Sequence, residues 1–264
     1  MNKALFTAKA CAKAWKIIDS SPTLTKLEKN VSGMLWKSKL LIHPYVQLDR
    51  GFVYIHVPKT AGTSLNKALG LKAKLTTSLH NRARDVMPFM KIIAPEVRAI
   101  TFVRNPYSRF VSLYRFAIAD ESLYHSARNP EKAPYGKHPD HDLLSNKNLE
   151  ECAELLIQGK LGDPRDNTPL WRPQVDWLVD KYGKLMVDFI GKMESLDSDL
   201  LKLQELYGIT SEPVSWLNRS NPGKKTPEFT ARTEELVRMY YKRDFEMLGY
   251  NEDRAACQQI QSAD

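Results

Sequence analysis

The stretch GFVYIHVPKTAGTS, residues 51–64, decides the fold of this chain. Its first half is short, rich in β-branched and aromatic residues, and bounded by Gly51 and Pro58. This pattern predicts a buried strand over residues 51–57, which ends at Pro58 because proline cannot donate a hydrogen bond to a sheet. A helix is predicted over about residues 64–69. The chain therefore passes from a strand through a short loop into a helix.

The loop between this strand and this helix has the composition of a phosphate cradle. Backbone N–H groups at a helix N-terminus attract anions, and a glycine such as Gly62 lets the backbone come close to a ligand. The loop differs from the GxxxxGK[ST] loop of NTPases because its lysine precedes its glycine. A Ser/Thr-rich helix start is the alternative, but it does not explain the Pro-Lys beginning. The predicted anion site consists of Lys59, Thr60, Ala61, Gly62, Thr63 and Ser64.

The rest of the chain alternates between strand and helix patterns. Strands are predicted at residues 99–103 and 185–190, the second ended by Gly191. Helices are predicted at residues 106–119, 194–207 and 230–247. Such alternation is typical of parallel βαβ units. We therefore expect a single P-loop-like α/β domain over residues 1–264, with a central parallel sheet and helices on both faces.

Two segments differ from this pattern. Residues 1–50 are expected to be a helical or irregular lead-in. Residues 120–168 are polar and rich in proline, so an irregular insertion or lid on the acceptor side is expected there.

A second anion-binding signal follows the strand at residues 99–103. Arg104 stands at the end of that strand, where α/β proteins place ligand-binding groups, and guanidinium suits bidentate contact with phosphate. Ser112 follows two helical turns later and adds a hydroxyl. Taken alone, Arg104 has the alternative of pairing with a surface carboxylate. Together with the Lys59 loop, it predicts one ligand with two phosphate groups.

These elements resemble a known family. VPKTAGTS at residues 57–64, followed by FVRNPYSRFVSLY at 102–114, is similar to the nucleotide-binding elements of the carbohydrate (Golgi-type, heparan sulfate 2-O-like) sulfotransferases. The likeness covers roughly residues 50–250 and includes WRPQ, VDFIG and a C-terminal run ending in LGY. It implies 3'-phosphoadenosine 5'-phosphosulfate (PAPS) as sulfuryl donor. The first loop would hold the 5'-phosphosulfate, and Arg104 with Ser112 would hold the 3'-phosphate.

The resemblance also implies a mechanism. Sulfuryl transfer requires a base for the attacking hydroxyl and neutralisation of charge on the leaving phosphate. Lys59 suits the second task. His80 is the proposed base, because neutral imidazole accepts protons near pH 7 and many relatives carry a histidine between the two loops. Some relatives use a carboxylate instead, and a solvated histidine is the alternative. PAPS carries the reactive group, so no metal is expected.

Other residues are secondary candidates. Relatives often close a loop over the nucleotide, which implies a role for Ser220 and Lys224, with a solvated basic turn as the alternative. The acceptor is expected to be a hydroxyl of a carbohydrate or glycolipid. Trp171, Arg172 and Gln174 are candidates for contact with it, although Trp171 is equally compatible with the core. His56 is expected to pack or to support the loop. In the run HPDHD, residues 138–142, a polar lid or acceptor contact is favoured over a metal site, because the spacing matches no standard ligand pattern.

Charge and composition restrict the remaining classes. The formal net charge of +8 indicates anionic partners. A P-loop-type kinase and a non-catalytic polyanion-binding protein are the alternatives. This chain lacks the Walker spacing that a P-loop kinase needs. Its cations cluster at two strand ends, which argues against a polyanion-binding protein and against nucleic acid as a partner. Residues 1–18 read as a basic amphipathic helix without the apolar core of a secretory signal, with peripheral membrane contact or a transit peptide as alternatives. Three scattered cysteines and no membrane span predict a cytoplasmic enzyme. Animal members of the family that the sequence resembles usually work in the Golgi behind a membrane anchor, so the resemblance implies a bacterial member.

Overall fold

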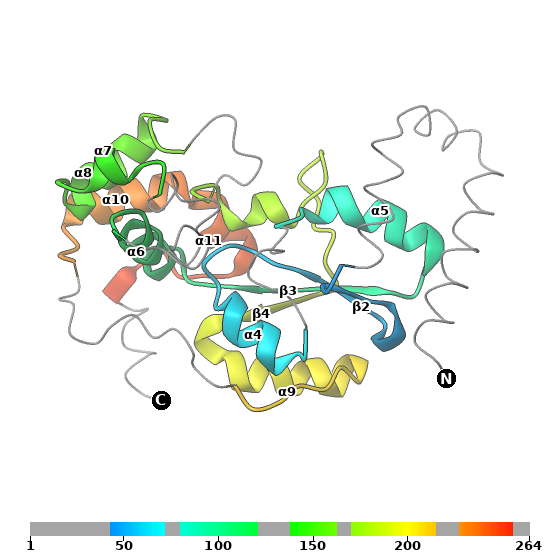
Figure 1. Cartoon of the computed structure of the whole chain (residues 1–264). Helices are drawn as coiled ribbons and strands as arrows, with labels where there is room; N and C mark the ends of the chain where they lie inside the picture. Colours follow the sequence, from blue (N-terminus) through cyan, green and yellow to red (C-terminus); the bar gives the residue numbers. More distant parts are fainter. Residues whose placement is uncertain (1–42, 72–79, 121–137, 163–169, 215–226, 256–264) are drawn as a thin grey trace.

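Figure 1 shows the computed structural model of the chain, in which helices cover both faces of a central sheet. The structure describes residues 43–71, 80–120, 138–162, 170–214 and 227–255. The elements in these ranges are β1 (Val46–Gln47), η1 (Leu48–Arg50), β2 (Phe52–Ile55), α4 (Gly62–Ala68), α5 (Ala83–Ile93), β3 (Arg98–Val103), α6 (Pro106–Ala117), α7 (His141–Leu144), α8 (Leu149–Ile157), η4 (Gln174–Trp177), β4 (Phe189–Lys192), η5 (Met193–Ser195), α9 (Leu196–Tyr207), α10 (Ala231–Tyr240) and α11 (Lys242–Leu248).

The sheet has the order β1-β2-β3-β4 in the described part of the chain. β2, β3 and β4 are parallel, with Ile55 opposite Thr101 and Thr101 opposite Ile190. β1 runs antiparallel to β2, to which the turn at η1 connects it. The predicted α/β class is confirmed, and the sheet is mixed because a short edge strand precedes the first parallel strand.

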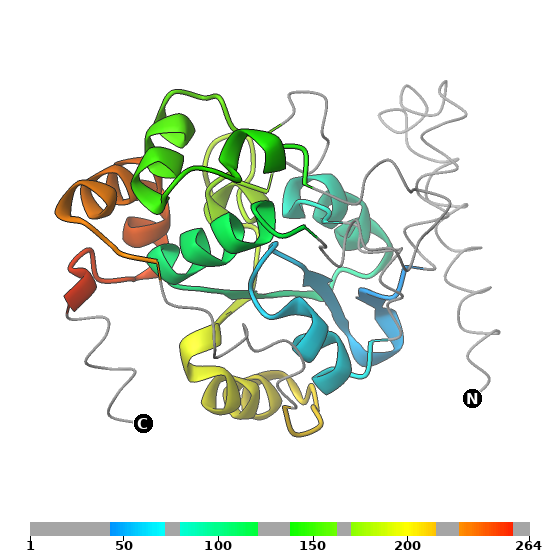
Figure 2. The same cartoon turned by 60° about the vertical axis from the view of Figure 1, so that its left-hand side comes forward.

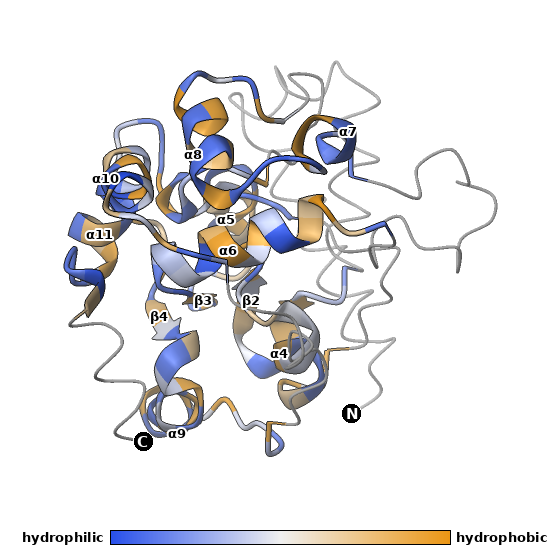
Figure 3. Cartoon of the chain, turned by 90° about the vertical axis from the view of Figure 1, so that its left-hand side faces the viewer, coloured by the Kyte–Doolittle hydropathy of each residue, from blue (hydrophilic) through white to orange (hydrophobic). Residues whose placement is uncertain are grey.

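Alternate residues of β2 pack on opposite faces of the sheet, as the two-residue period of a strand requires. Phe52 and Tyr54 join a core with α4 and α9, whereas Val53 and Ile55 join a core with α5. Figures 1 and 2 show α4 and α9 on one side of the sheet and α5 on the other. The helices carry hydrophobic and hydrophilic residues on different faces (Figure 3). The prediction of helices on both faces is therefore confirmed.

A third core lies beyond the carboxyl end of β3, where α6 packs with α8, α10 and α11 (Figure 1). The expected irregular segment is wrong for residues 141–157, which form α7 and α8. α8 begins with a capping box, in which Asn148 and Glu151 each accept a hydrogen bond from the other's backbone N–H. Its buried apolar face secures this segment to α10. Residues 121–137 and 163–169 lie outside the described ranges.

The fourth strand differs from its predicted position at residues 185–190. Leu185 instead forms an isolated antiparallel bridge with Val179, and β4 starts at Phe189. Gly191 lies inside β4 rather than ending it. A Cβ atom added there would lie 2.3 Å from Cε1 of Phe102, so this glycine allows an aromatic ring to pack against the strand backbone.

The helix predicted over residues 230–247 is two helices that meet at Tyr241. Tyr241 is fully buried, and its hydroxyl donates to the carbonyl of Trp171 at 2.8 Å. The break changes the direction of the chain so that Asp244, on α11, faces η4.

Candidate active site

The loop that joins β2 to α4 has an unusual backbone. Lys59 and Ala61 have φ angles of 69° and 58°, in the left-handed region that non-glycine residues rarely adopt. The Thr60 hydroxyl donates to the Val57 carbonyl at 2.8 Å and so secures the turn. Ala61 occupies the N-cap of α4 and has no side chain that can cap it. Backbone strain of this kind concentrates at functional sites.

Gly62 lies directly against the ring of His56. A Cβ atom at Gly62 would be 1.9 Å from His56 Nε2, closer than any real contact. The ring is held from its other side, because His56 Nδ1 is 3.1 Å from the Tyr45 hydroxyl, which accepts from Asn66 Nδ2 at 3.2 Å. Burial lowers the pKa of His56 well below its usual range, and His80 lowers it further, so the ring is neutral. The prediction that His56 packs or supports the loop is confirmed, since its buried ring lies against Gly62.

We expect Gly62→Ala to lower the free energy of unfolding by about 1–3 kcal/mol, because the methyl group overlaps the His56 ring. At an open helical position the same change raises the free energy of unfolding by about 1 kcal/mol. A loss of stability at Gly62 would therefore indicate the contact with His56. Chemical denaturation measures the effect. The double variant His56→Ala/Gly62→Ala removes the overlap, so Gly62→Ala should cost little in that background. Equal costs in both backgrounds would contradict the packing described above.

Lys59 lies in a cluster of positive charge. Its side chain is half-buried, and its ammonium nitrogen lies 4.3 Å from the centroid of the Phe116 ring, on α6. Burial first, and the nearby cations Arg104 and Arg109 second, together lower the pKa of Lys59 from 10.5 to about 8. The structure thus brings together the two cations that sequence analysis assigned to separate phosphate groups. Clustered like charges of this kind indicate an anionic ligand.

Arg104 follows β3 directly and is half-buried. Its Nε donates to the Ser108 hydroxyl at 3.0 Å, one turn into α6. Burial lowers the pKa of Arg104, whereas Glu194 raises it. Ser112 is half-buried on α6, two turns after Arg104 as expected. α6 begins here because Asn105 caps it and Pro106 occupies its first turn.

Arg109 was not among the residues predicted for the site, and it is 1% exposed. Its Nε donates to the Pro58 carbonyl at 3.1 Å, and its two terminal nitrogens donate to the carbonyls of Arg172 and Leu170 at 3.0 and 2.9 Å. Arg109 therefore joins the Lys59 loop to the segment before η4. Its three partners are backbone carbonyls distant in sequence, so the pattern around residue 109 carries no signal for this role.

His80 lies beside the loop. Its Nδ1 donates to the His56 carbonyl at 3.2 Å, and its ring centroid lies 4.6 Å from that of His56 and 5.8 Å from that of Trp177. In the neutral ring, a proton on Nδ1 leaves the lone pair on Nε2. The contacts thus fix the position of the residue proposed as the base, and the bond to the His56 carbonyl favours the tautomer with the proton on Nδ1.

The expected acceptor contact is wrong for Gln174, and for Trp171 the core alternative is confirmed. Gln174 is fully buried. Trp171 is 3% exposed and donates from its indole nitrogen to Asp140 at 2.7 Å, so it belongs to the core. Arg172 is exposed. Asp140 also accepts from the Gly162 N–H at 3.0 Å, and His138, Asp140 and His141 of the HPDHD run are buried, which contradicts the expected polar lid.

Some predicted features lie outside the described ranges: the candidates Ser220 and Lys224, and the basic amphipathic helix expected over residues 1–18. Within those ranges, no group of three or more His, Cys, Asp or Glu side chains is arranged to hold a metal ion. No helix of the described residues has the length and apolarity needed to cross a membrane.

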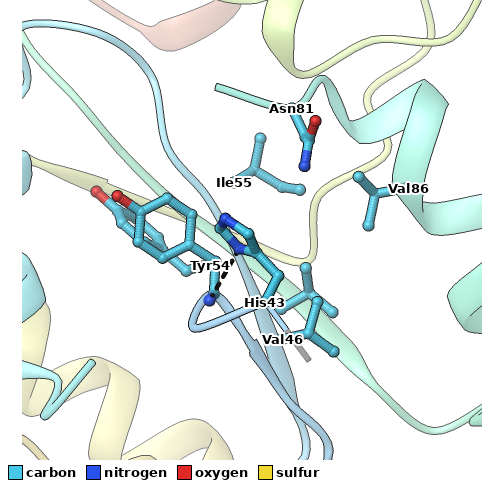
Figure 4. Close-up of a pocket in the computed structure, with 8 residues that line it drawn as sticks. His43, Val46, Tyr54, Ile55, Asn81 and Val86 are labelled. Carbon is cyan, nitrogen blue, oxygen red and sulfur yellow. Dashed lines mark hydrogen bonds between the residues drawn. The ribbon is translucent and has the colours of Figure 1, made fainter. Parts of the chain in front are cut away.

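A small hollow lies between β2 and the start of α5 (Figure 4), and its lining includes Tyr45, which contacts His56. His43 lines it and accepts the Tyr45 N–H through Nδ1 at 3.2 Å. The lining is mostly apolar and contains neither lysine nor arginine. It is therefore not a candidate for binding a phosphate.

Comparison with known proteins agrees with this geometry. A family model described as "Sulfotransferase family" matches residues 43–251, a range that includes both cation-bearing loops, His80 and the C-terminal helices. No solved structure matches the chain significantly.

Proposed function

Because this chain belongs to the sulfotransferase family, we propose that it transfers a sulfuryl group from PAPS to a hydroxyl of a carbohydrate or glycolipid. Family membership supports sulfuryl transfer over the kinase alternative. The donor and the acceptor class are the parts of the proposal that go beyond the family.

One observation carries the assignment of the donor: Lys59 and Arg104 follow neighbouring parallel strands and lie close enough for Arg104 to lower the pKa of Lys59. Such a pair suits a nucleotide with phosphate groups at two positions. In the proposal, Lys59 and the loop residues Thr60 to Ser64 bind the 5'-phosphosulfate. Arg104 and Ser112 bind the 3'-phosphate, and Ser220 and Lys224 close over the nucleotide.

In the proposed reaction, the acceptor oxygen forms a bond to sulfur while the bond from sulfur to the bridging phosphate oxygen breaks. His80 Nε2 takes the proton of the hydroxyl, since Nδ1 is bonded to the His56 carbonyl. Lys59 neutralises the negative charge that develops on the leaving phosphate. The products are the sulfate ester and 3'-phosphoadenosine 5'-phosphate (PAP).

Calorimetric titration with PAP, AMP and ATP tests the nucleotide assignment. We expect PAP to bind most tightly, and Arg104→Ala to weaken PAP binding by about 10- to 100-fold, as for one or two charged hydrogen bonds, with little effect on AMP. Arg84→Ala, an exposed change on α5, is the matched control and should leave PAP affinity unchanged. A preference for ATP, or equal affinity for PAP and AMP, would contradict the proposal and reopen the kinase or polyanion-binding alternatives.

A further inference from the structure

The buried amide of Gln174 holds the backbone of Arg104. Its Oε1 accepts the Arg104 N–H at 2.9 Å, and its Nε2 donates to the Arg104 carbonyl at 2.7 Å. One side chain thereby pairs with both backbone groups of the residue that follows the last residue of β3. Gln174 therefore pairs with Arg104 as a neighbouring strand would, just beyond the end of β3.

Asp244 in turn holds Gln174. Its two carboxylate oxygens accept the N–H groups of Gln174 at 2.8 Å and Val175 at 3.0 Å. The Gln174 amide nitrogen also lies 3.3 Å from Asp244 Oδ2. Because Asp244 and Gln174 are both fully buried, these hydrogen bonds are shielded from competing water. The chain of contacts runs from α11 through η4 to the end of β3.

A second carboxylate fixes the residue after Arg104. Glu194 accepts the Asn105 N–H at 2.7 Å and the Tyr250 hydroxyl at 3.0 Å. Arg104 Nε also donates to Ser108, so hydrogen bonds constrain the backbone of Arg104, the backbone of Asn105 and the Arg104 guanidinium. Three segments without an assigned nucleotide contact therefore converge on Arg104 and its neighbour Asn105: WRPQ at residues 171–174, ESLD at 194–197 and YKRDFEMLGY at 241–250.

From these contacts we infer that Gln174 and Asp244 are positioning residues that aim the Arg104 guanidinium and thereby set the selectivity for a 3'-phosphorylated nucleotide. The inference rests on the proposed function, in which Arg104 meets the 3'-phosphate. A bidentate contact with phosphate needs the fork of the guanidinium placed to within about 0.5 Å. An arginine at a strand end without these backbone partners would sample several directions and lose that geometry.

The test compares calorimetric affinities for PAP and AMP, which differ only in the 3'-phosphate. Gln174→Met keeps the size of the side chain but removes both bonds to Arg104. We expect it to lower PAP affinity by about 10-fold or more while AMP affinity stays within about 3-fold, so the PAP/AMP ratio falls. Asp244→Asn retains the shape and should lower the ratio in the same direction, by a smaller factor. Val175→Ala, in the same buried turn, is the control: it removes core packing without touching Arg104 and should leave the ratio unchanged.

The outcomes separate the two hypotheses. If the unmodified protein does not prefer PAP to AMP, the proposed function fails and this inference fails with it. If it prefers PAP and either folded variant keeps that preference in full, the positioning role alone is overturned. A ratio that falls equally in Val175→Ala would also overturn it, because the effect would then reflect general loosening of the core.

Discussion

Lys59→Met is expected to lower the rate of sulfuryl transfer by about 10²–10³-fold and to stabilise the ligand-free protein. The rate falls because the ammonium group that neutralises the leaving phosphate is lost, and removal of one such electrostatic contact typically has this effect. Release of PAP from PAPS in the presence of hydroxylated acceptors measures the rate. Unchanged transfer in Lys59→Met would contradict the mechanism.

The gain in stability follows from the pKa of Lys59, which burial first, and Arg104 and Arg109 second, lower to about 8. Because this pKa is below the ordinary 10.5, the charged form destabilises the folded state. The resulting loss in the free energy of unfolding is complete below pH 8 and disappears as the pH rises towards 10.5. Solvent screening and the favourable contact with Phe116 reduce this effect. We expect Lys59→Met to raise the free energy of unfolding by about 1–2 kcal/mol at pH 7.

Urea denaturation at pH 7 and pH 10 measures this difference. The advantage of Lys59→Met should shrink at pH 10, where the native lysine is also neutral in the folded protein. Lys67→Met is the matched control: the residue is exposed on α4, so both stability and transfer should stay unchanged. An advantage that persists in full at pH 10 would show that hydrophobic packing, rather than charge, is its cause.

His80→Ala is expected to lower transfer at pH 7 by about 10²–10⁴-fold, the range of a general base, while PAP affinity stays within about 2-fold. The separation is expected because His80 is proposed to contact the acceptor hydroxyl rather than the nucleotide. Rates of PAP release and calorimetric PAP affinities, measured on the same preparations, give the two quantities.

His80→Asn separates the chemical role from a structural one. The asparagine amide can donate to the His56 carbonyl as Nδ1 does, but it cannot accept a proton. We therefore expect this variant to fold, to bind PAP and to be as inactive as His80→Ala. Recovery of activity in His80→Asn would mean that the hydrogen bond alone matters. Full activity in His80→Ala would transfer the role of base to a carboxylate, as in some members of the family that the sequence resembles.

Local sequence signals predicted the elements that carry the proposed nucleotide site. The apolar run before Pro58 forms β2, and the Arg-Asn-Pro sequence ends β3 and starts α6 through the Asn105 cap. α8 was missed although its signals were present: Asn148 and Glu151 have capping-box spacing, and apolar residues recur at helical intervals between 149 and 156. The proline-rich composition of the surrounding segment concealed them.

By itself, the sequence determined the order of strands and helices and the two cation-bearing loops, because propensities, caps and turns depend on residues within a few positions of one another. Only the tertiary structure decided what Arg109, Gln174 and Trp171 do, since their partners lie between 31 and 70 positions away in the chain. The same holds for Gly191, whose need to be small comes from the ring of Phe102 on the neighbouring strand. Burial and hydrogen bonding depend on which surfaces meet when the elements pack.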